Sequence, residues 1–219
     1  MKLTIFNGSP RGQESNTKIL LDSFLEGFES PENEYKIFYL IENEIIKNVN
    51  RFINSPNVIL AFPLYTDAMP GIVKDFIEKL GVNKKETVNT SVGFMVQSGF
   101  PEAYHSRCVE RYLIKLSRRM HWNYQGTLVK GGVEGIKNRP GWMNRKLFKN
   151  LERMGEIYSQ DRRFDPGTIK NLAPSERFSP VKLIFVKFLM KTGLLDSFWN
   201  QQLKKNQAYE KRFARPYKE

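Results

Sequence analysis

Short apolar runs recur along the first two thirds of the chain, separated by longer segments of mixed character. These runs predict five strands, at Leu3–Phe6, Tyr35–Leu40, Val58–Phe62, Val92–Val96 and Thr127–Val129. The third run contains no polar residue, which is expected for a central parallel strand covered on both faces.

Apolar residues spaced three or four positions apart predict a helix after each strand. They are, in order, Leu21, Phe24, Leu25 and Phe28; Ile45, Ile46, Val49 and Ile53; Val73, Phe76, Ile77 and Leu80; Val109, Tyr112, Leu113, Leu116 and Met120; and Leu147, Leu151, Met154 and Tyr158. Pro70 is expected near the start of the third helix and Gly81 just after its last turn. Five strand–helix units in succession predict a doubly wound parallel α/β sheet.

The polar stretch from Asn7 to Thr17 lies between the first strand and the first helix. Ser15 or Asn16 is predicted as the N-cap, at the positive end of the helix dipole. Hydroxyl groups in this stretch and the planar guanidinium of Arg11 suit a phosphate group. The stretch therefore predicts an anion cradle, and the alternative is an ordinary polar turn before a capped helix.

Two motifs carry a resemblance to a known family. Gly8-Ser9-Pro10-Arg11, followed by Ser15-Asn16-Thr17, resembles the FMN-phosphate loop of the flavodoxin-like NAD(P)H-dependent FMN reductases. The segment Pro63–Gly71, with Lys74 and Phe76 downstream, resembles the flavin-ring loop of that family. The resemblance covers about residues 1–160. It implies strand order 2-1-3-4-5, with FMN at the switch point between the first and third strands.

The resemblance also implies a set of cofactor-binding residues. These are Ser9, Arg11, Ser15, Asn16, Thr17, Pro63, Leu64, Tyr65, Thr66, Asp67, Ala68, Met69, Gln97, Ser98 and Gly99. Tyr65 is expected to offer an aromatic face to the flavin, and the next three residues their backbone amides. The carboxylate of Asp67 is expected to cap the following helix. The segment Gln97–Phe100 is expected along the pyrimidine side of the ring, while Tyr104 lies either near the nicotinamide or on the outside of a helix.

The implied activity is that of an oxidoreductase which takes hydride from NADH or NADPH and reduces a small acceptor such as a quinone, a flavin, or a nitro or azo compound. The flavin carries this chemistry, so no catalytic side chain is assigned. No metal site is predicted, because two histidines, His105 and His121, are too few without a cluster of cysteine or acidic residues to complete a ligand set. The fingerprints of dinucleotide-binding and nucleoside-triphosphate loops are also missing.

Composition sets the remaining limits. The chain of 219 residues fits one domain with an appendage, and its 40% hydrophobic content is ordinary. Its single cysteine, Cys108, fits a reducing compartment and is expected as a small buried residue. No apolar run approaches the roughly 18 residues of a membrane span, and the N-terminus shows no signal-peptide pattern. We therefore expect a cytoplasmic protein.

The formal charge of +12 widens the range of functions. A basic surface attracts nicotinamide nucleotides, anionic substrates, acidic partners, nucleic acid or anionic lipid. Small flavodoxin electron carriers are typically acidic, so the charge counts against a noncatalytic FMN-binding carrier, which stays as the first alternative. A nucleic-acid or membrane-surface binder is the second alternative. No nucleic-acid readout motif is present and no nucleic-acid partner is expected, whereas contact with a membrane surface stays open as the less favoured case.

We expect two parts: a flavodoxin-like domain at residues 1–160, which binds FMN if the resemblance holds, and a C-terminal helical extension at residues 161–219. Within the extension, Asp165-Pro166-Gly167 is expected as a turn, and a linker is expected to end at an N-cap, Ser179. A nearly all-apolar helix follows from Val181 to Met190, since the segment is too hydrophobic for a disordered tail. A further helix is expected from Asp196, carrying Trp199, Leu203, Tyr209 and Phe213.

Apolar side chains cover most of the circumference of the helix expected at Val181–Met190, so this helix needs a surface to cover it. We expect residues 180–213 to pack across a homodimer interface and to help wall the flavin site, as the reductase resemblance implies. Folding back on its own sheet and docking on a membrane surface are the alternatives.

Overall fold

A computed structural model describes residues 1–173, 175–192, 196–215 and 217. The chain divides into two compact units, Met1–Glu176 and Arg177–Glu219. The first unit therefore ends later than the residue 160 expected from the sequence. Pro174, in the expected linker, lies outside the described residues, and so does Pro216.

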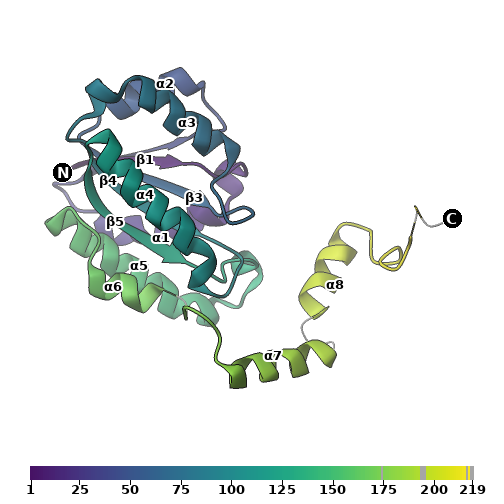
Figure 1. Cartoon of the computed structure of the whole chain (residues 1–219). Helices are drawn as coiled ribbons and strands as arrows, with labels where there is room; N and C mark the ends of the chain where they lie inside the picture. Colours follow the sequence, from purple (N-terminus) through teal and green to yellow (C-terminus); the bar gives the residue numbers. More distant parts are fainter. Residues whose placement is uncertain (174, 193–195, 216, 218–219) are drawn as a thin grey trace. The chain divides into compact units, whose positions relative to one another are not determined.

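The first unit contains a five-stranded sheet in which every pairing is parallel. Its strands are β1 (Lys2–Asn7), β2 (Glu34–Tyr39), β3 (Asn57–Pro63), β4 (Ser91–Gln97) and β5 (Asn123–Lys130). They lie in the order β2-β1-β3-β4-β5, as predicted (Figure 1). This arrangement confirms the doubly wound fold and brings the ends of β1, β3 and β4 together at one edge.

Helices follow the strands and cover both faces of the sheet (Figure 1). The α-helices of this unit are α1 (Asn16–Phe28), α2 (Ile45–Ile53), α3 (Gly71–Val82), α4 (Arg107–Met120), α5 (Gly141–Asp161) and α6 (Pro166–Leu172). The 3₁₀ helices are η1 (Gly12–Glu14), η2 (Lys84–Thr87), η3 (Ala103–Ser106) and η4 (Ile136–Asn138). One face packs against α2, α3 and α4, and the other against α1, α5 and α6.

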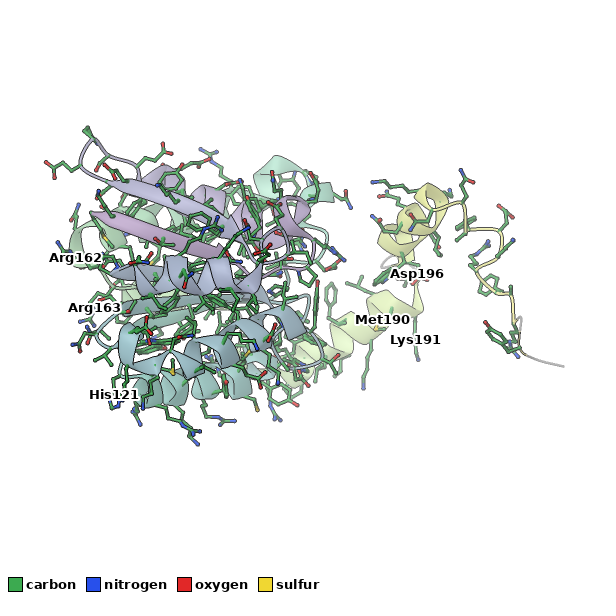
Figure 2. The ribbon with its side chains drawn as sticks, turned by 90° about the horizontal axis from the view of Figure 1, so that it is seen from above. His121, Arg162, Arg163, Met190, Lys191 and Asp196 are labelled. Atoms are coloured by element: carbon green, nitrogen blue, oxygen red, sulfur yellow. The ribbon has the colours of Figure 1, made fainter. Side chains whose placement is uncertain are left out.

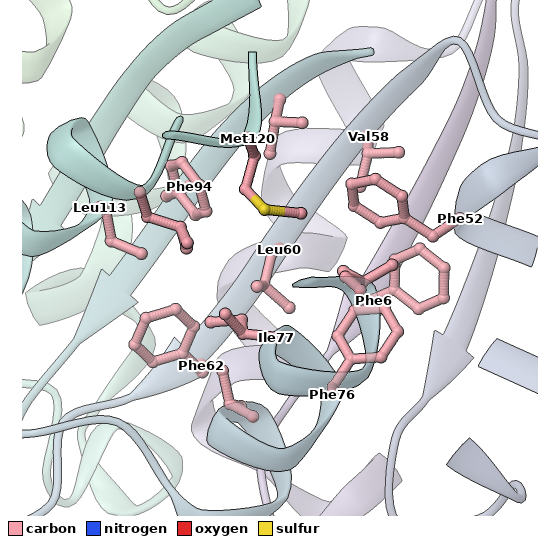
Figure 3. Packing of buried hydrophobic residues seen from close by; sticks show 14 of the residues in the cluster. Phe6, Phe52, Val58, Leu60, Phe62, Phe76, Ile77, Phe94, Leu113 and Met120 are labelled. Atoms are coloured by element: carbon pink, nitrogen blue, oxygen red, sulfur yellow. The ribbon is translucent and has the colours of Figure 1, made fainter. Parts of the chain in front are cut away.

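Successive side chains of β3 point to opposite faces of the sheet, so this strand contributes to the hydrophobic cores on both sides. Leu60 and Phe62 face the α2–α4 side, where Phe6 and Phe76 pack with ring centroids 5.0 Å apart (Figure 3). Ile59 faces the opposite side, toward α1 and α5. Both sides are fully buried, which explains why this strand has an uninterrupted apolar sequence.

Helices α1 and α5 approach closely enough to require glycine at their crossing. A Cβ atom on Gly27 would lie 1.8 Å from the carbonyl oxygen of Glu152. A Cβ atom on Gly155 would lie 1.9 Å from the carbonyl oxygen of Phe24. No side chain fits at either position, so these two glycines fix the place of α1 against its neighbour.

Two boundaries differ from the sequence-based predictions. Gly81 is not the residue after α3, because the helix continues to Val82 and is capped at Asn83. The Asp165-Pro166-Gly167 segment is the start of α6 rather than an isolated turn. The Asp165 carboxylate accepts the backbone N–H of Thr168, and Pro166 occupies the first turn, where no N–H is needed.

The second unit contains α7 (Pro180–Lys191) and α8 (Asp196–Lys205). Ser179 is the N-cap of α7, as predicted, and its hydroxyl accepts the backbone N–H of Lys182. The expected helix from Asp196 is shorter than predicted. It ends at Lys205, and Tyr209 and Phe213 lie beyond it among turns.

Candidate functional site

The loop after β1 is organised by a buried asparagine. The side-chain oxygen of Asn7 accepts the backbone N–H of Ser9 at 2.9 Å. Its amide nitrogen donates to the hydroxyl oxygen of Ser15 at 3.2 Å. Asn7 therefore ties the start of the loop to the start of α1, a role that the sequence did not reveal because asparagine is common in polar turns.

Ser15 is the N-cap of α1, one of the two residues predicted for that place. Its hydroxyl oxygen also accepts the backbone N–H of Lys18 at 3.1 Å, which leaves its own proton free to donate. Asn16 and Thr17 are buried, and their backbone N–H groups have no acceptor within the described part of the chain. Unpaired buried donors at a helix N-terminus suit an anion.

Arg11 adds a positive charge beside these donors. Its side chain is exposed, and its guanidinium has no hydrogen-bond partner among the described residues. Its backbone N–H donates to the hydroxyl oxygen of Ser9 at 3.3 Å, which holds the two residues in one turn. The loop therefore presents an unpaired planar cation and oriented hydroxyl groups, which fits the predicted cradle for a terminal phosphate.

The second predicted loop begins where β3 and β4 end side by side. Pro63 and Leu64 are buried, and the backbone N–H of Leu64 donates to the carbonyl of Gln97 at 2.7 Å. Met69 packs at the edge of the core on the α2–α4 side. The segment between Leu64 and Met69 is thus held at both ends while its middle is exposed.

A tight turn occupies that middle. The backbone N–H of Tyr65 donates to the carbonyl of Ala68 at 2.8 Å, and the N–H of Ala68 donates back at 3.0 Å. Thr66 and Asp67 lie between them with φ of 47° and 60°. This left-handed conformation is uncommon for a β-branched residue such as threonine, and strain of this kind gathers at functional sites.

The turn corrects part of the amide prediction. The N–H of Ala68 is used inside the turn and is not available to a ring. The N–H groups of Thr66 and Asp67 have no acceptor in the part of the chain that the structure describes. Two of the three amides proposed to meet the flavin are therefore free to do so.

The Asp67 side chain does not cap α3, and this prediction was wrong. The cap position is Pro70, with no side-chain hydrogen bond. The Asp67 carboxylate instead lies 3.3 Å from Nδ1 of His105, on η3. The His105 ring stacks on Phe100 with centroids 4.2 Å apart. This contact joins two loops that are distant in sequence, so no local pattern could show it.

The third loop of the site, Gln97–Phe100, begins at the end of β4. Gln97 donates to the Thr17 hydroxyl oxygen at 3.3 Å, which links the end of β4 to α1. The backbone of Ser98 pairs with the loop after β5, accepting the N–H of Val133 at 2.9 Å. Asn16 donates its side-chain amide to the carbonyl of Val133 at 3.3 Å. Four loops therefore form one hydrogen-bonded rim, with Gly99 facing Glu134 across it.

Two other sequence-based expectations concern this rim. Cys108 is exposed at the start of α4 rather than buried, and it lines a cavity of about 350 Å³ with Met69 and Tyr112. Tyr104 is half-exposed on η3, with its ring 4.5 Å from that of His105. Backbone groups of Ser175 and Glu176 accept hydrogen bonds from η3, so the first unit ends beside the rim.

Comparisons with known proteins agree with the observed fold. A family model described as flavodoxin-like fold matches residues 1–107. No curated protein matches the sequence. Solved structures resemble the chain at low sequence identity.

An NADPH-quinone reductase from P. pentosaceus is 15% identical, with a TM-score of 0.53, and the match covers 70% of this chain and 96% of that one. The Trp repressor binding protein from Bacillus subtilis is 19% identical, with a TM-score of 0.53 and coverage of 69% and 96%. An FMN-dependent NADH-azoreductase from Bacillus anthracis in complex with FMN is 14% identical, with a TM-score of 0.56 and coverage of 73% and 100%. Together with the strand order, these matches show that the fold is flavodoxin-like.

Proposed function

We propose that the protein is an FMN-dependent oxidoreductase that accepts hydride from NADH or NADPH and passes the electrons to a small acceptor such as a quinone, a flavin, or a nitro or azo compound. The names of the structurally similar reductases support the reaction class. The observation that carries the proposal is the set of unpaired donors at the N-terminus of α1, which follows β1, together with the free amides of the Tyr65–Ala68 turn, which follows the neighbouring parallel strand β3.

The phosphate of FMN would be held by the first loop. The Arg11 guanidinium, the hydroxyl protons of Ser9 and Ser15, and the N–H groups of Asn16 and Thr17 supply charge-assisted donors. Asn7 positions these donors, because its side chain forms hydrogen bonds with both Ser9 and Ser15. Riboflavin lacks the phosphate and would leave these donors unused.

The ring of FMN would lie against the second and third loops. Bound FMN supplies the redox chemistry, which the protein tunes through position and electrostatics. The free N–H groups of Thr66 and Asp67 point to a role in stabilising negative charge on the polar edge of the ring. The contact between Asp67 and His105 restrains this turn, and Tyr65, 44% exposed, offers an aromatic surface.

Anaerobic reduction tests this function. The purified protein, saturated with FMN, is mixed with excess NADH or NADPH while its visible flavin absorbance is followed. We expect the absorbance to bleach without any added protein and to return when a quinone is supplied. If neither nucleotide bleaches a normally bound flavin over minutes, the noncatalytic carrier is the better description.

A further inference from the structure

The second unit carries an amphipathic helix whose apolar face is uncovered. At 100° per residue, Val181, Ile184, Phe185, Phe188 and Leu189 share one face of α7. No residue of α7 is buried, and Val181 and Phe188 are 76% and 61% exposed. Large apolar side chains in water are costly, at about 1.5–3 kcal/mol each. This face therefore requires a covering surface.

Lysines border the face on both sides. On the same helical projection, Lys182 lies next to Leu189, and Lys191 lies next to Ile184. Figure 2 shows Met190 and Lys191 at the end of α7, where the side chains stand away from the ribbon. Helix α7 contains no acidic residue. Lysines beside an apolar face can bury their stems while their ammonium groups reach a polar boundary.

The second unit as a whole is also strongly basic. Ten of the 35 Lys and Arg residues lie in residues 177–219, but only three of the 23 Asp and Glu residues. This short segment thus holds +7 of the formal charge of +12. Two of its aromatic residues are largely exposed, Trp199 on α8 and Phe213 beside Arg212. Aromatic and basic residues together are typical of the interface between a membrane and water.

We propose that α7 lies flat on an anionic lipid membrane, with its apolar face in the headgroup boundary and the basic residues of the second unit against the lipid phosphates. Among the described residues, no helix is long and apolar enough to cross a membrane. The 12 residues of α7 instead suit an in-plane helix. The proposal does not depend on the flavin reaction.

Two other surfaces fit less well. Both faces of the sheet in the first unit are already covered by helices, which leaves no open sheet face for α7. A second copy of the segment would place two clusters of +7 close together, where like charges repel. Anionic lipid complements the charge and the apolar face at once. The predicted homodimer across residues 180–213 is therefore the competing outcome in the test.

Co-sedimentation of the full chain with lipid vesicles tests the proposal. We expect binding to phosphatidylcholine vesicles that contain phosphatidylglycerol, weak binding to phosphatidylcholine alone, and weaker binding as salt is raised. Replacing Lys182, Lys187 and Lys191 with Gln should lower the partition coefficient about a hundredfold, since each basic residue near an anionic surface contributes about fivefold. The matched control replaces three exposed basic residues of α5, Arg145, Lys146 and Lys149, with Gln and should bind as the natural sequence does.

A second pair of variants tests the apolar face. The double variant Phe185→Ser and Phe188→Ser should lose at least about tenfold in partitioning, whereas Trp142→Ser, an exposed aromatic of α5, should change nothing. Circular dichroism and thermal unfolding check that every variant is folded. Failure of the natural sequence to bind anionic vesicles would overturn the proposal, and so would an equal loss of binding in the α7 lysine variant and the α5 control variant. A lipid-free dimer in analytical ultracentrifugation that the double variant converts to monomer would assign the face to a second copy instead.

Discussion

Both units of this chain contain segments rich in phenylalanine, but these side chains are buried in the first unit and exposed in the second. In the first unit, Phe76 on α3 and Phe94 on β4 are fully buried between the sheet and its helices. In the second unit, Phe185 and Phe188 on α7 are mostly exposed. The hydrophobic pattern predicts a helix in both places, but it does not identify the surface that covers it. In our two proposals, FMN would pair the free donors of the first unit and a membrane would cover the apolar face of the second.

The largest expected effect is a direct contrast between two phenylalanines. Phe76→Ala removes a fully buried ring and should lower the free energy of unfolding by about 3–5 kcal/mol. Phe188→Ala removes an exposed ring and should change it by less than about 0.5 kcal/mol. Urea denaturation of both variants, without lipid, measures the difference. Similar losses would mean that α7 is buried in solution and that the contrast between the units is wrong.

The crossing of α1 and α5 gives the next effect. Gly155→Ala places a Cβ atom against the backbone of Phe24 and should destabilise the protein by about 3 kcal/mol. Because α1 carries the cradle, flavin affinity should also fall. Gly81→Ala is the matched control, since a Cβ atom there meets no atom within 4 Å, and it should stabilise α3 by about 0.5–1 kcal/mol. Equal thermal stability of the two variants would show that the helices do not approach so closely.

Replacing Tyr158 is expected to change the free energy of unfolding by a smaller amount, and this change depends on pH. Its hydroxyl is buried without a hydrogen-bond partner among the described residues, so Tyr158→Phe should stabilise the first unit by about 1 kcal/mol. Burial also raises the pKa of Tyr158 above its ordinary value of 10.0. The folded protein therefore keeps the hydroxyl neutral above pH 10 while the unfolded chain ionises, and stability falls as the pH rises through that range.

The phenylalanine variant lacks this alkaline loss. The advantage of Tyr158→Phe in urea denaturation should consequently be constant below about pH 10 and increase above it. A constant difference at all pH values would place the hydroxyl in contact with solvent.

The strands and the cap of the first helix could be predicted from the sequence because each depends on local signals, while the strand order followed from the family resemblance. The apolar run of β3 and the Ser15 cap are examples, since the first follows from burial on both faces and the second from unpaired helix N–H groups. The positions of the three loops then followed from the topology, since parallel strands end at a common edge.

Contacts between distant residues were the part that could not be predicted. Asp67 was expected to cap the adjacent helix, but its partner is His105, which only the fold brings near. The role of Asn7 likewise depends on its hydrogen bond to Ser15, eight residues further along the chain, which the folded loop brings within reach. The short helix α6 was missed for a different reason, because an Asp-Pro-Gly segment is compatible with a turn and with a capped helix start.

Flavin titration of the full chain shows whether the loop after β1 binds a terminal phosphate. Flavin-free protein is titrated with FMN and with riboflavin, and fluorescence quenching gives each affinity for the natural sequence, for Arg11→Ala, and for Arg118→Ala, an exposed arginine of α4 that serves as the control. We predict that FMN binds more tightly than riboflavin and that Arg11→Ala weakens FMN binding about ten- to a hundredfold without affecting riboflavin. Equal FMN affinity in the natural sequence and Arg11→Ala, or equal affinity for the two flavins, would contradict the phosphate cradle on which the account rests.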